Sequence, residues 1–231
     1  MGISSFLRKT SEEGSENGPT LVSYRVDLAG HDPMALSSRL YDVIDYPRAL
    51  KELAGHISGV SEEGVEFVSV WADAQAAEAA FRSAVENLGV LWNEFPGIKA
   101  DRETYPVHRF VVTEGAEQYD PDRAQPHPPC VSYRMDIPIH GRDIYDTAAE
   151  LMNFPEEIPD GMLMHIASET ADGWTTYTVW HGVENAREYM RDKIMPASLQ
   201  IVRDQQIFPE IRPVEIVPTL FASNPALIPV A

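Results

Sequence analysis

Short stretches of the chain alternate apolar and polar residues, and each such stretch predicts a strand with one apolar face. In 21–28 the apolar positions Val22, Tyr24 and Val26 alternate with polar ones. Further strands are predicted over 53–59, 65–71, 105–113, 130–137, 162–168, 174–181 and 211–217.

Apolar residues three or four positions apart predict helices between these strands. The first follows the cap-like pair Asp32-Pro33 and extends to Ile44. The others are predicted over 74–88, 143–153, 183–194 and 196–208. Gly89 and Pro196 stand at the ends of the two long helices, so we expect both helices to break at the same relative place.

The pattern occurs twice, at a constant spacing of 109 residues from Leu21 to Cys130. His56 falls on His165 and Trp71 on Trp180 at the same spacing. Self-similarity at one spacing indicates one structural unit used twice. Each copy has the order strand, helix, strand, strand, helix, strand, which is typical of the ferredoxin-like fold. The bare face of each sheet needs a cover. We therefore expect an α+β fold of two tandem ferredoxin-like (βαββαβ) domains that form an intramolecular pseudo-dimeric α/β barrel.

Composition divides the chain further. Residues 1–20 are rich in Ser, Glu and Gly and predict a disordered leader, and 114–129 are rich in Pro and charge and predict a linker. The two domains are then 21–113 and 130–217. The tail 218–231 is apolar although rich in proline, and we expect it to lie along a surface groove.

Charge and cysteine content exclude several classes of protein. A net charge of −18 argues against binding nucleic acid through phosphate neutralisation. No apolar run reaches the roughly 18 to 20 residues that would span a membrane. The single cysteine, Cys130, excludes a disulfide framework, so a reducing cytoplasm is the expected location. Cys130 begins a strand and is expected to be a packed thiol.

The first strand of each copy carries one polar triplet, and the three side chains of each triplet point to the same side of the sheet. They are Ser23, Arg25 and Asp27, and their equivalents Ser132, Arg134 and Asp136. On a covered face such groups need partners. One interpretation is an ion-pair network between the copies, with Arg25 on Asp136 and Arg134 on Asp27. The other is substrate binding.

Histidines offer the most direct acid–base chemistry. Imidazole titrates near neutrality and suits a general base. His56 and His165 lie on the second strand of each copy, and His31 and His140 follow the first strands. For His56 and His165 a structural role, bonded to a neighbour in the sheet, is an equally good interpretation. For His31 and His140 the alternative is a loop residue near a helix N-terminus. His165 has the richer surroundings, formed by Met162, Met164, Trp174, Tyr177, Trp180, His181 and Tyr189. No His or Cys spacing typical of a metal site occurs, so no metal is expected.

Three segments of the second half resemble the antibiotic biosynthesis monooxygenase group of the dimeric α/β barrel superfamily. They are Gly161–His165, Trp174–Trp180 and the helix start Glu184–Tyr189; Val70-Trp71 is the counterpart in the first half. The resemblance implies the barrel fold. It also implies a set of activities: cofactor-independent oxygenases of aromatic polyketides, haem-degrading enzymes, cyclases, isomerases and proteins without known activity.

The haem-degrading branch of that superfamily has a ligand His about three helical turns after the Trp. Phe81 and Met190 stand at that place here. The first strands also lack the branch's Asn. Haem degradation is therefore not expected, and the prediction includes no cofactor.

These observations predict a cofactor-independent enzyme of secondary metabolism, a monooxygenase acting on an aromatic or polyketide-like substrate. His165 or Tyr133 would remove a proton, and Arg134 would stabilise the oxyanion. Trp174, Trp180, Tyr177, Met164, Tyr189 and His140 would bind the substrate.

Two alternatives stay open. One is a cyclase, isomerase or lyase that does not use oxygen, and the other is a non-catalytic ligand-binding or scaffold protein. We expect one working pocket, in the second half, and a first half that supports it. The expected partner is a small apolar or aromatic molecule, with no nucleic acid and no membrane. A further homodimer is left open.

Overall fold

The computed structural model describes residues 6–9, 18–33, 35, 36, 39, 53–60, 64–113, 130–205 and 216–223. The described strands are β1 (Phe6–Lys9), β2 (Thr20–Asp27), β3 (Leu53–Val60), β4 (Val65–Trp71), β5 (Lys99–Val112), β6 (Cys130–Ile137), β7 (Met162–Thr170), β8 (Gly173–Trp180) and β9 (Ile216–Ser223). The described helices are α3 (Ala74–Glu94), α4 (Arg142–Leu151), α5 (Val183–Tyr189), the π-helical turn η1 (Met190–Ile194) and α6 (Met195–Gln205). None of these helices is long and apolar enough to cross a membrane.

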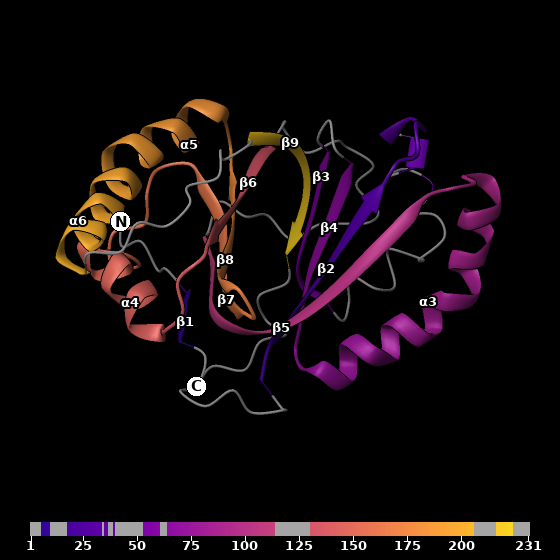
Figure 1. The fold of residues 1–231 in the computed structure, drawn as a ribbon, viewed down its shortest axis with the longest axis horizontal. Helices are drawn as coiled ribbons and strands as arrows, with labels where there is room; N and C mark the ends of the chain where they lie inside the picture. Colours follow the sequence, from indigo (N-terminus) through magenta and orange to yellow (C-terminus); the bar gives the residue numbers. More distant parts are fainter. Residues whose placement is uncertain are drawn as a thin grey trace.

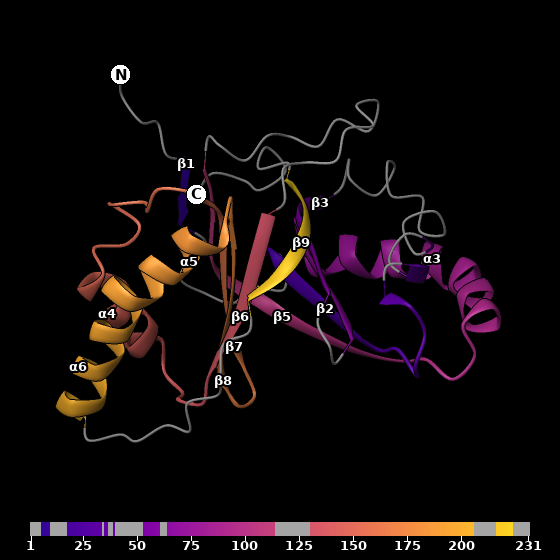
Figure 2. The same ribbon diagram turned by 90° about the horizontal axis from the view of Figure 1, so that it is seen from above.

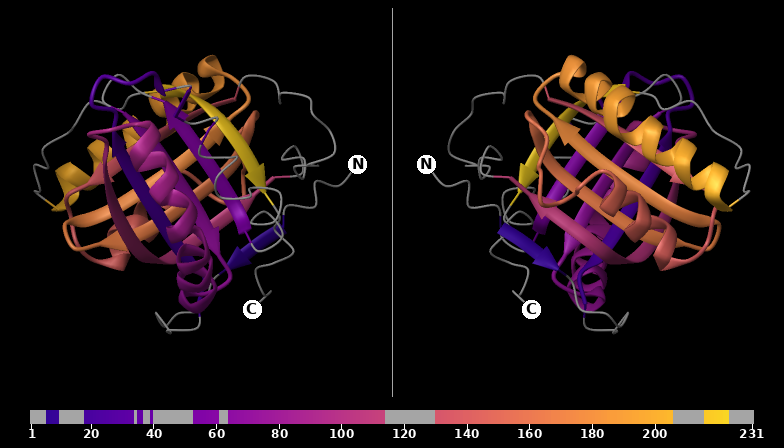
Figure 3. Two further views of the ribbon diagram at one scale, coloured as in Figure 1. Left: turned by 90° about the vertical axis from the view of Figure 1, so that its right-hand side faces the viewer. Right: turned by 90° about the vertical axis from the view of Figure 1, so that its left-hand side faces the viewer.

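The strands form one antiparallel sheet in the order β1-β5-β2-β4-β3-β9-β6-β8-β7. A further pairing of β5 with β7 closes this sheet on itself, with β1 attached alongside β5 (Figure 1 and Figure 3). The result is a mixed α+β fold in which the described helices lie outside a closed, curled sheet.

Two strands close the sheet because each pairs at one end with its own half of the chain and at the other end with the opposite half. Residues 99–106 of β5 pair with β2, and 107–112 pair with β7. In the same way, 216–219 of β9 pair with β6 and 219–223 pair with β3. Neither half is therefore a separate sheet.

Alternation along each strand separates an interior face from a helix-covered face. The interior is filled by apolar residues from both halves, among them Leu21, Val70, Phe110 and Val179. On the outer faces, α3 lies over the first half, while α4, α5 and α6 lie over β6, β8 and β7 (Figure 2). The two helical layers are at opposite ends of the molecule.

Most of the predicted strands are confirmed to within two residues at each end, and β5 and β9 differ by more. β5 begins at Lys99 rather than at 105. The prediction missed these first residues because they are mostly exposed and show no apolar alternation. β9 covers 216–223, so the prediction of a last strand over 211–217 and a surface tail from 218 was wrong for 218–223. Pro218 lies inside β9, opposite Val131, and a proline inside a run argues against a strand.

The predicted breaks of the two long helices were wrong. α3 continues through Gly89 to Glu94. In the second half the helical run continues from Val183 to Gln205. The π-helical turn η1 lies directly before Pro196 and lets the helix continue past this proline. The Met195 N–H bonds the Met190 carbonyl five residues back, a π-type bond. Proline lacks an N–H and its ring crowds the carbonyl four residues before it, so a widened turn keeps the helix whole.

The ends and the linker are described only in part. Within 1–20, where a disordered leader is expected, Phe6–Lys9 forms β1 on β5 and Thr20 begins β2. The linker 114–129 and the end of the tail after Ser223 lie outside the described residues. Of the helix predicted from Pro33 to Ile44, the described positions 33, 35, 36 and 39 are helical.

Two glycines should respond in opposite ways to alanine. Gly173 has φ +134°, and a Cβ there would lie 2.1 Å from the Ile137 carbonyl oxygen. We expect Gly173→Ala to lower the free energy of unfolding by about 2 kcal/mol or more. Gly89 is helical and exposed with open space around it, so Gly89→Ala should raise that free energy by about 0.5–1 kcal/mol. Urea unfolding measures both, and midpoints shifted in the same direction would contradict the structure.

Candidate functional site

Aromatic and polar side chains gather between the sheet and the helices of the second half. Alternation on β6, β7 and β8 brings Tyr133, His165, Trp174 and Trp180 to the helix-covered face. Helices and the loop after α4 complete this group, which we name the helix-side cluster: Tyr133, Tyr145, Phe154, His165, Trp174, Trp180 and Tyr189. Five of the predicted site residues are therefore brought together.

His165 is at the centre of the cluster. The Tyr145 hydroxyl lies 2.8 Å from its Nε2, and Thr178 Oγ1 lies 3.0 Å from its Nδ1. The Phe154 ring meets it edge-on at 5.0 Å. Burial, with a smaller contribution from the charge of Arg109, lowers the pKa of His165 to about 3. The imidazole is therefore neutral at physiological pH.

His165 is half-buried, whereas the rings around it are buried. The exposed fraction is 5% for Tyr145, 4% for Phe154 and 1% for Trp174. His165 therefore lies in a largely enclosed, aromatic setting.

The tyrosines of the cluster keep their protons. Burial raises the pKa of Tyr133 to about 12, and it also raises the pKa of Tyr145 and of Tyr189. At neutral pH these hydroxyls are hydrogen-bond donors rather than anions. Tyr133 is thus a donor in the resting protein and not a base.

Two polar atoms of the cluster face are buried without a hydrogen-bond partner among the described residues. They are Thr176 Oγ1 and Trp180 Nε1. The Trp180 N–H lies near the Tyr133 hydroxyl and lowers its pKa slightly, but it makes no bond of ordinary geometry. Buried polar groups are nearly always paired, so such atoms indicate a place where a ligand could supply the partner.

The first half lacks an unpaired indole at the position that is equivalent to Trp180. Trp71 corresponds to Trp180, and its N–H donates to Ser69 Oγ at 2.9 Å. Thr178, the equivalent of Ser69, is engaged by His165 instead. Smaller or apolar residues of the first half stand where the cluster has polar or aromatic ones: Leu36 for Tyr145, Val65 for Trp174, Phe67 for Thr176 and Ala80 for Tyr189.

The sequence did not reveal the charged part of this site, which comes from the crossing strand β5. The register of β5 on β7 shifts between Val107 and Arg109, a bulge at His108. A bulge can turn two neighbouring side chains to one face. His108 Nε2 and Arg109 NH2 both reach Asp146 Oδ1 on α4, at 3.1 and 3.2 Å. We call His108, Arg109 and Asp146 the bulge group.

The bulge group touches the cluster directly. The His108 ring meets Trp174 at 5.0 Å and Tyr145 at 5.4 Å, both edge-on. The Arg109 guanidinium lies 5.4 Å from the centre of the Tyr145 ring. The site of the second half is thus completed by residues of the first half.

Four of the predicted site residues lie elsewhere. Arg134, Tyr177 and Met164 are on the interior face of the sheet. His140 is exposed in the loop after β6. The prediction that Arg134 acts together with Tyr133 was wrong, because neighbouring strand residues point to opposite faces. That alternation was readable in the sequence.

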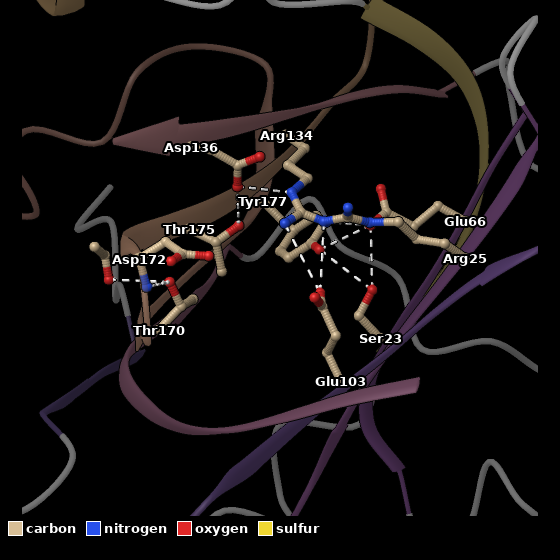
Figure 4. A network of polar contacts seen from close by, with 11 residues as sticks. Ser23, Arg25, Glu66, Glu103, Arg134, Asp136, Thr170, Asp172, Thr175 and Tyr177 are labelled. Atoms are coloured by element: carbon tan, nitrogen blue, oxygen red, sulfur yellow. Dashed lines mark hydrogen bonds and ion pairs between the residues drawn. The ribbon is translucent and has the colours of Figure 1, made fainter. Parts of the chain in front are cut away.

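Arg134 belongs instead to a polar network inside the barrel (Figure 4). Glu66 Oε1 accepts hydrogen bonds from Arg134 at 2.8 Å, from Tyr177 at 2.9 Å and from Ser23 at 3.1 Å. Arg25 reaches the same oxygen at 3.4 Å and Glu103 at 3.5 Å. An ion-pair network between the two halves is therefore present.

The partners in this network differ from the predicted ones. Arg134 pairs with Glu66 and, on its own strand, with Asp136 at 2.8 Å. Arg25 pairs with Glu66 and Glu103 rather than with Asp136. Asp27 is exposed and accepts from the Ala29 N–H. The two glutamates were missed because they lie on β4 and β5, whereas the prediction considered charged residues only on the first strand of each copy.

Metal and haem ligands are not found where the site would need them. The described residues hold no group of three His, Cys, Asp or Glu side chains that could bind a metal ion. Helices α3, α4, α5 and α6 contain no histidine, and Phe81 packs on Tyr24. A haem iron would find no imidazole on these helices, so no step is derived through haem. Cys130 is buried, and burial raises the pKa of its thiol, against a nucleophilic role.

Similarity to known proteins is detected in structure rather than in sequence. No family model matches the chain, and no curated protein matches it. A "putative monooxygenase" from Lactobacillus acidophilus NCFM has 12% identity and a TM-score of 0.62, over 89% of this chain and 96% of that one. Another, from Fusobacterium nucleatum, has 10% identity and a TM-score of 0.63, over 90% and 94%.

A mutant chlorite dismutase from Candidatus Nitrospira defluvii, in complex with cyanide, has 9% identity and a TM-score of 0.50, over 89% of this chain and 92% of that one. At such identities the likeness shows the fold alone. The chain has the dimeric α/β barrel fold of these proteins.

His56, the first-half equivalent of His165, yields a test of burial. It is 4% exposed, and burial lowers its pKa to about 3. The unfolded chain binds a proton there below about pH 6.5 while the native state does not, so acid lowers stability. His56→Gln should remove about 3 kcal/mol of the stability lost between pH 7 and pH 4. Urea unfolding at both pH values measures this, with His181→Gln at an exposed position as control. Parallel losses in wild type and His56→Gln would contradict it.

Proposed function

We propose that the protein is a cofactor-independent enzyme of monooxygenase type that binds a small aromatic substrate in the helix-side cluster. The observation that carries this proposal is His165, a neutral imidazole enclosed by buried aromatic rings and held by Tyr145 and Thr178. The unpaired Trp180 N–H and Thr176 hydroxyl support it, since both would gain a partner from a bound polar group. The monooxygenase-like fold is consistent with it.

The proposal includes two tandem ferredoxin-like units, 21–113 and 130–217, joined by 114–129. The repeated pairing supports it: β2, β4 and β3 neighbour one another as β6, β8 and β7 do, and β5 and β9 exchange ends. The pairing of Trp71 with Ser69 supports a first unit without a working pocket. The second unit would then hold the single site.

His165 would act as the general base although its pKa is low in the empty site. Much of that lowering is the cost of a lone charge in a buried place. A proton taken from the substrate leaves an anion beside the imidazolium. Two such charges about 4 Å apart attract by about 4 kcal/mol at an effective dielectric constant of about 20, equivalent to about three pKa units. The base therefore becomes effective when the substrate anion is held next to it.

Tyr133 and Trp180 would stabilise the oxyanion, the role first expected of Arg134. The Tyr133 hydroxyl keeps its proton, and the Trp180 N–H has no protein partner of ordinary geometry. Neutral donors held in place before the reaction stabilise developing charge at low reorganisation cost. The reacting carbonyl would lie between these donors and His165.

The oxygen step needs no external reductant if the substrate has a methylene group conjugated with a ketone through aromatic rings, as anthrone has. His165 removes one proton, and the carbanion passes one electron to dioxygen. The two radicals combine as a C–O bond, and the imidazolium returns its proton to the peroxide. Loss of water then converts the methylene carbon into a ketone, so one dioxygen supplies the oxygen atoms of the new carbonyl and of the water. The substrate supplies all the electrons.

Conversion of anthrone to anthraquinone, with and without dioxygen, tests the proposal. We expect turnover in air, none under anaerobic conditions, and a loss of about 100-fold in kcat/KM for His165→Gln. His181→Gln, at an exposed position, is the control and should match wild type. Full activity of His165→Gln would exclude it as the base. Anaerobic turnover of a related substrate would favour a cyclase or isomerase, and binding without turnover a ligand-binding protein.

A further inference from the structure

We propose that Arg109 binds a carboxylate of the ligand at the edge of the helix-side cluster, so that the natural ligand is an aromatic acid. The inference relies on the proposed function only for the location of the site. Arg109 comes from the first half of the chain, on the strand β5 that crosses to β7. It is one of the residues that the sequence alone did not single out.

The guanidinium of Arg109 has unused hydrogen-bond donors. Its described hydrogen bonds are two long ones, from NH2 to Asp146 Oδ1 at 3.2 Å and from NH1 to the Phe154 carbonyl at 3.5 Å. An arginine has five N–H donors, and a paired carboxylate is usually bound by two of them at 2.7–2.9 Å. The side chain is only 16% exposed, yet its unused nitrogens are not among the fully buried atoms, so they lie where a ligand can reach them.

The unused donors lie beside the reactive part of the cluster. The guanidinium lies over the Tyr145 ring, 5.4 Å from its centre, and the hydroxyl of that ring is bonded to His165. Its positive charge acts to lower the pKa of both residues. A carboxylate on Arg109 would therefore place an attached aromatic ring against Tyr145 and Trp174.

The net charge of the chain bears on the role of the Arg109 guanidinium. The chain has a net charge of −18, which disfavours the approach of anions in general. A mostly buried arginine whose donors are partly unused is suited to recognise one anionic group. Asp146 does not fully satisfy the guanidinium, because it is 42% exposed and shares the same oxygen with His108.

Asp146 should therefore compete with the ligand for Arg109. Removing its charge would leave the guanidinium more positive and remove a repulsion on an incoming carboxylate. A purely structural role for the pair, which ties α4 to β5, predicts the opposite result, since losing the tie would loosen the site. Asp146→Asn thus separates the two interpretations.

Binding of 2-naphthoate and of its neutral analogue 2-naphthamide tests the inference, by calorimetry on the full chain at fixed ionic strength. We expect naphthoate to bind more tightly than naphthamide. Arg109→Gln should weaken naphthoate by about 10-fold to 100-fold and naphthamide by less than about twofold. Arg109→Lys, which keeps the charge without the fork, should give an intermediate loss. Asp146→Asn should tighten naphthoate by about threefold or more.

Arg102→Gln is the matched control, because Arg102 is on the same strand and lies over the Phe81 ring of the first half. It should leave both affinities unchanged. Circular dichroism and thermal melting check the fold, and Arg109→Lys and Asp146→Asn decide the question if Arg109→Gln does not fold. Equal binding of the two probes, no binding of either, or weaker naphthoate binding by Asp146→Asn would overturn the inference. Anthrone turnover is measured separately, so either proposal can fail alone.

Discussion

Closure of the sheet by β5 and β9 is the constraint on which the rest of this structure depends. Each of these strands pairs with one half at its beginning and with the other half at its end. Each half therefore covers sheet edges that the other would leave open, and exposed edges favour aggregation. Closure also assigns every strand residue to the interior or to the helices, because side chains alternate.

The interior polar network depends on this closure. Glu66 of the first half and Arg134 of the second can meet only when the two halves face one another. Both are mostly buried, and removing one partner of a buried pair costs about 3–5 kcal/mol because the other charge is left uncompensated. Several donors converge on Glu66, yet burial still raises the pKa of its carboxyl. The network thus favours one particular alignment of the halves over others.

The succession of most strands along the chain and the face that many of their side chains occupy could be predicted from the sequence. Alternation in 21–28 and 130–137 separates the polar triplets from Tyr24 and Tyr133, which face the helices in the structure. Alternation fails for Lys99–Arg102, which are mostly exposed, and for β9, where Pro218 interrupts the pattern. Helix continuity fails at Gly89 and Pro196, because packing and a π turn tolerate residues that usually end helices.

The sequence predicted those residues of the candidate site that lie on repeated strands, but not those that reach the site only through contacts between distant elements. His165, Trp174 and Trp180 follow from strands that the repeat makes visible. Arg109 and His108 do not, since a register shift of one residue in β5 leaves no mark in composition or spacing. Asp146 likewise acquires its role only through the fold, because its partners are 37 and 38 positions away along the chain.

The indoles of Trp71 and Trp180 show what one continuous chain makes possible. A symmetric homodimer has a single sequence for both of its subunits, so a change that silences one pocket silences the other. Here Ser69 pairs with one indole while Thr178 leaves the other available. One continuous chain allows the first half to accumulate substitutions that favour rigidity while the second keeps unpaired polar groups. Stability and ligand binding, which usually compete at the same residues, can then be divided between different ends of one molecule.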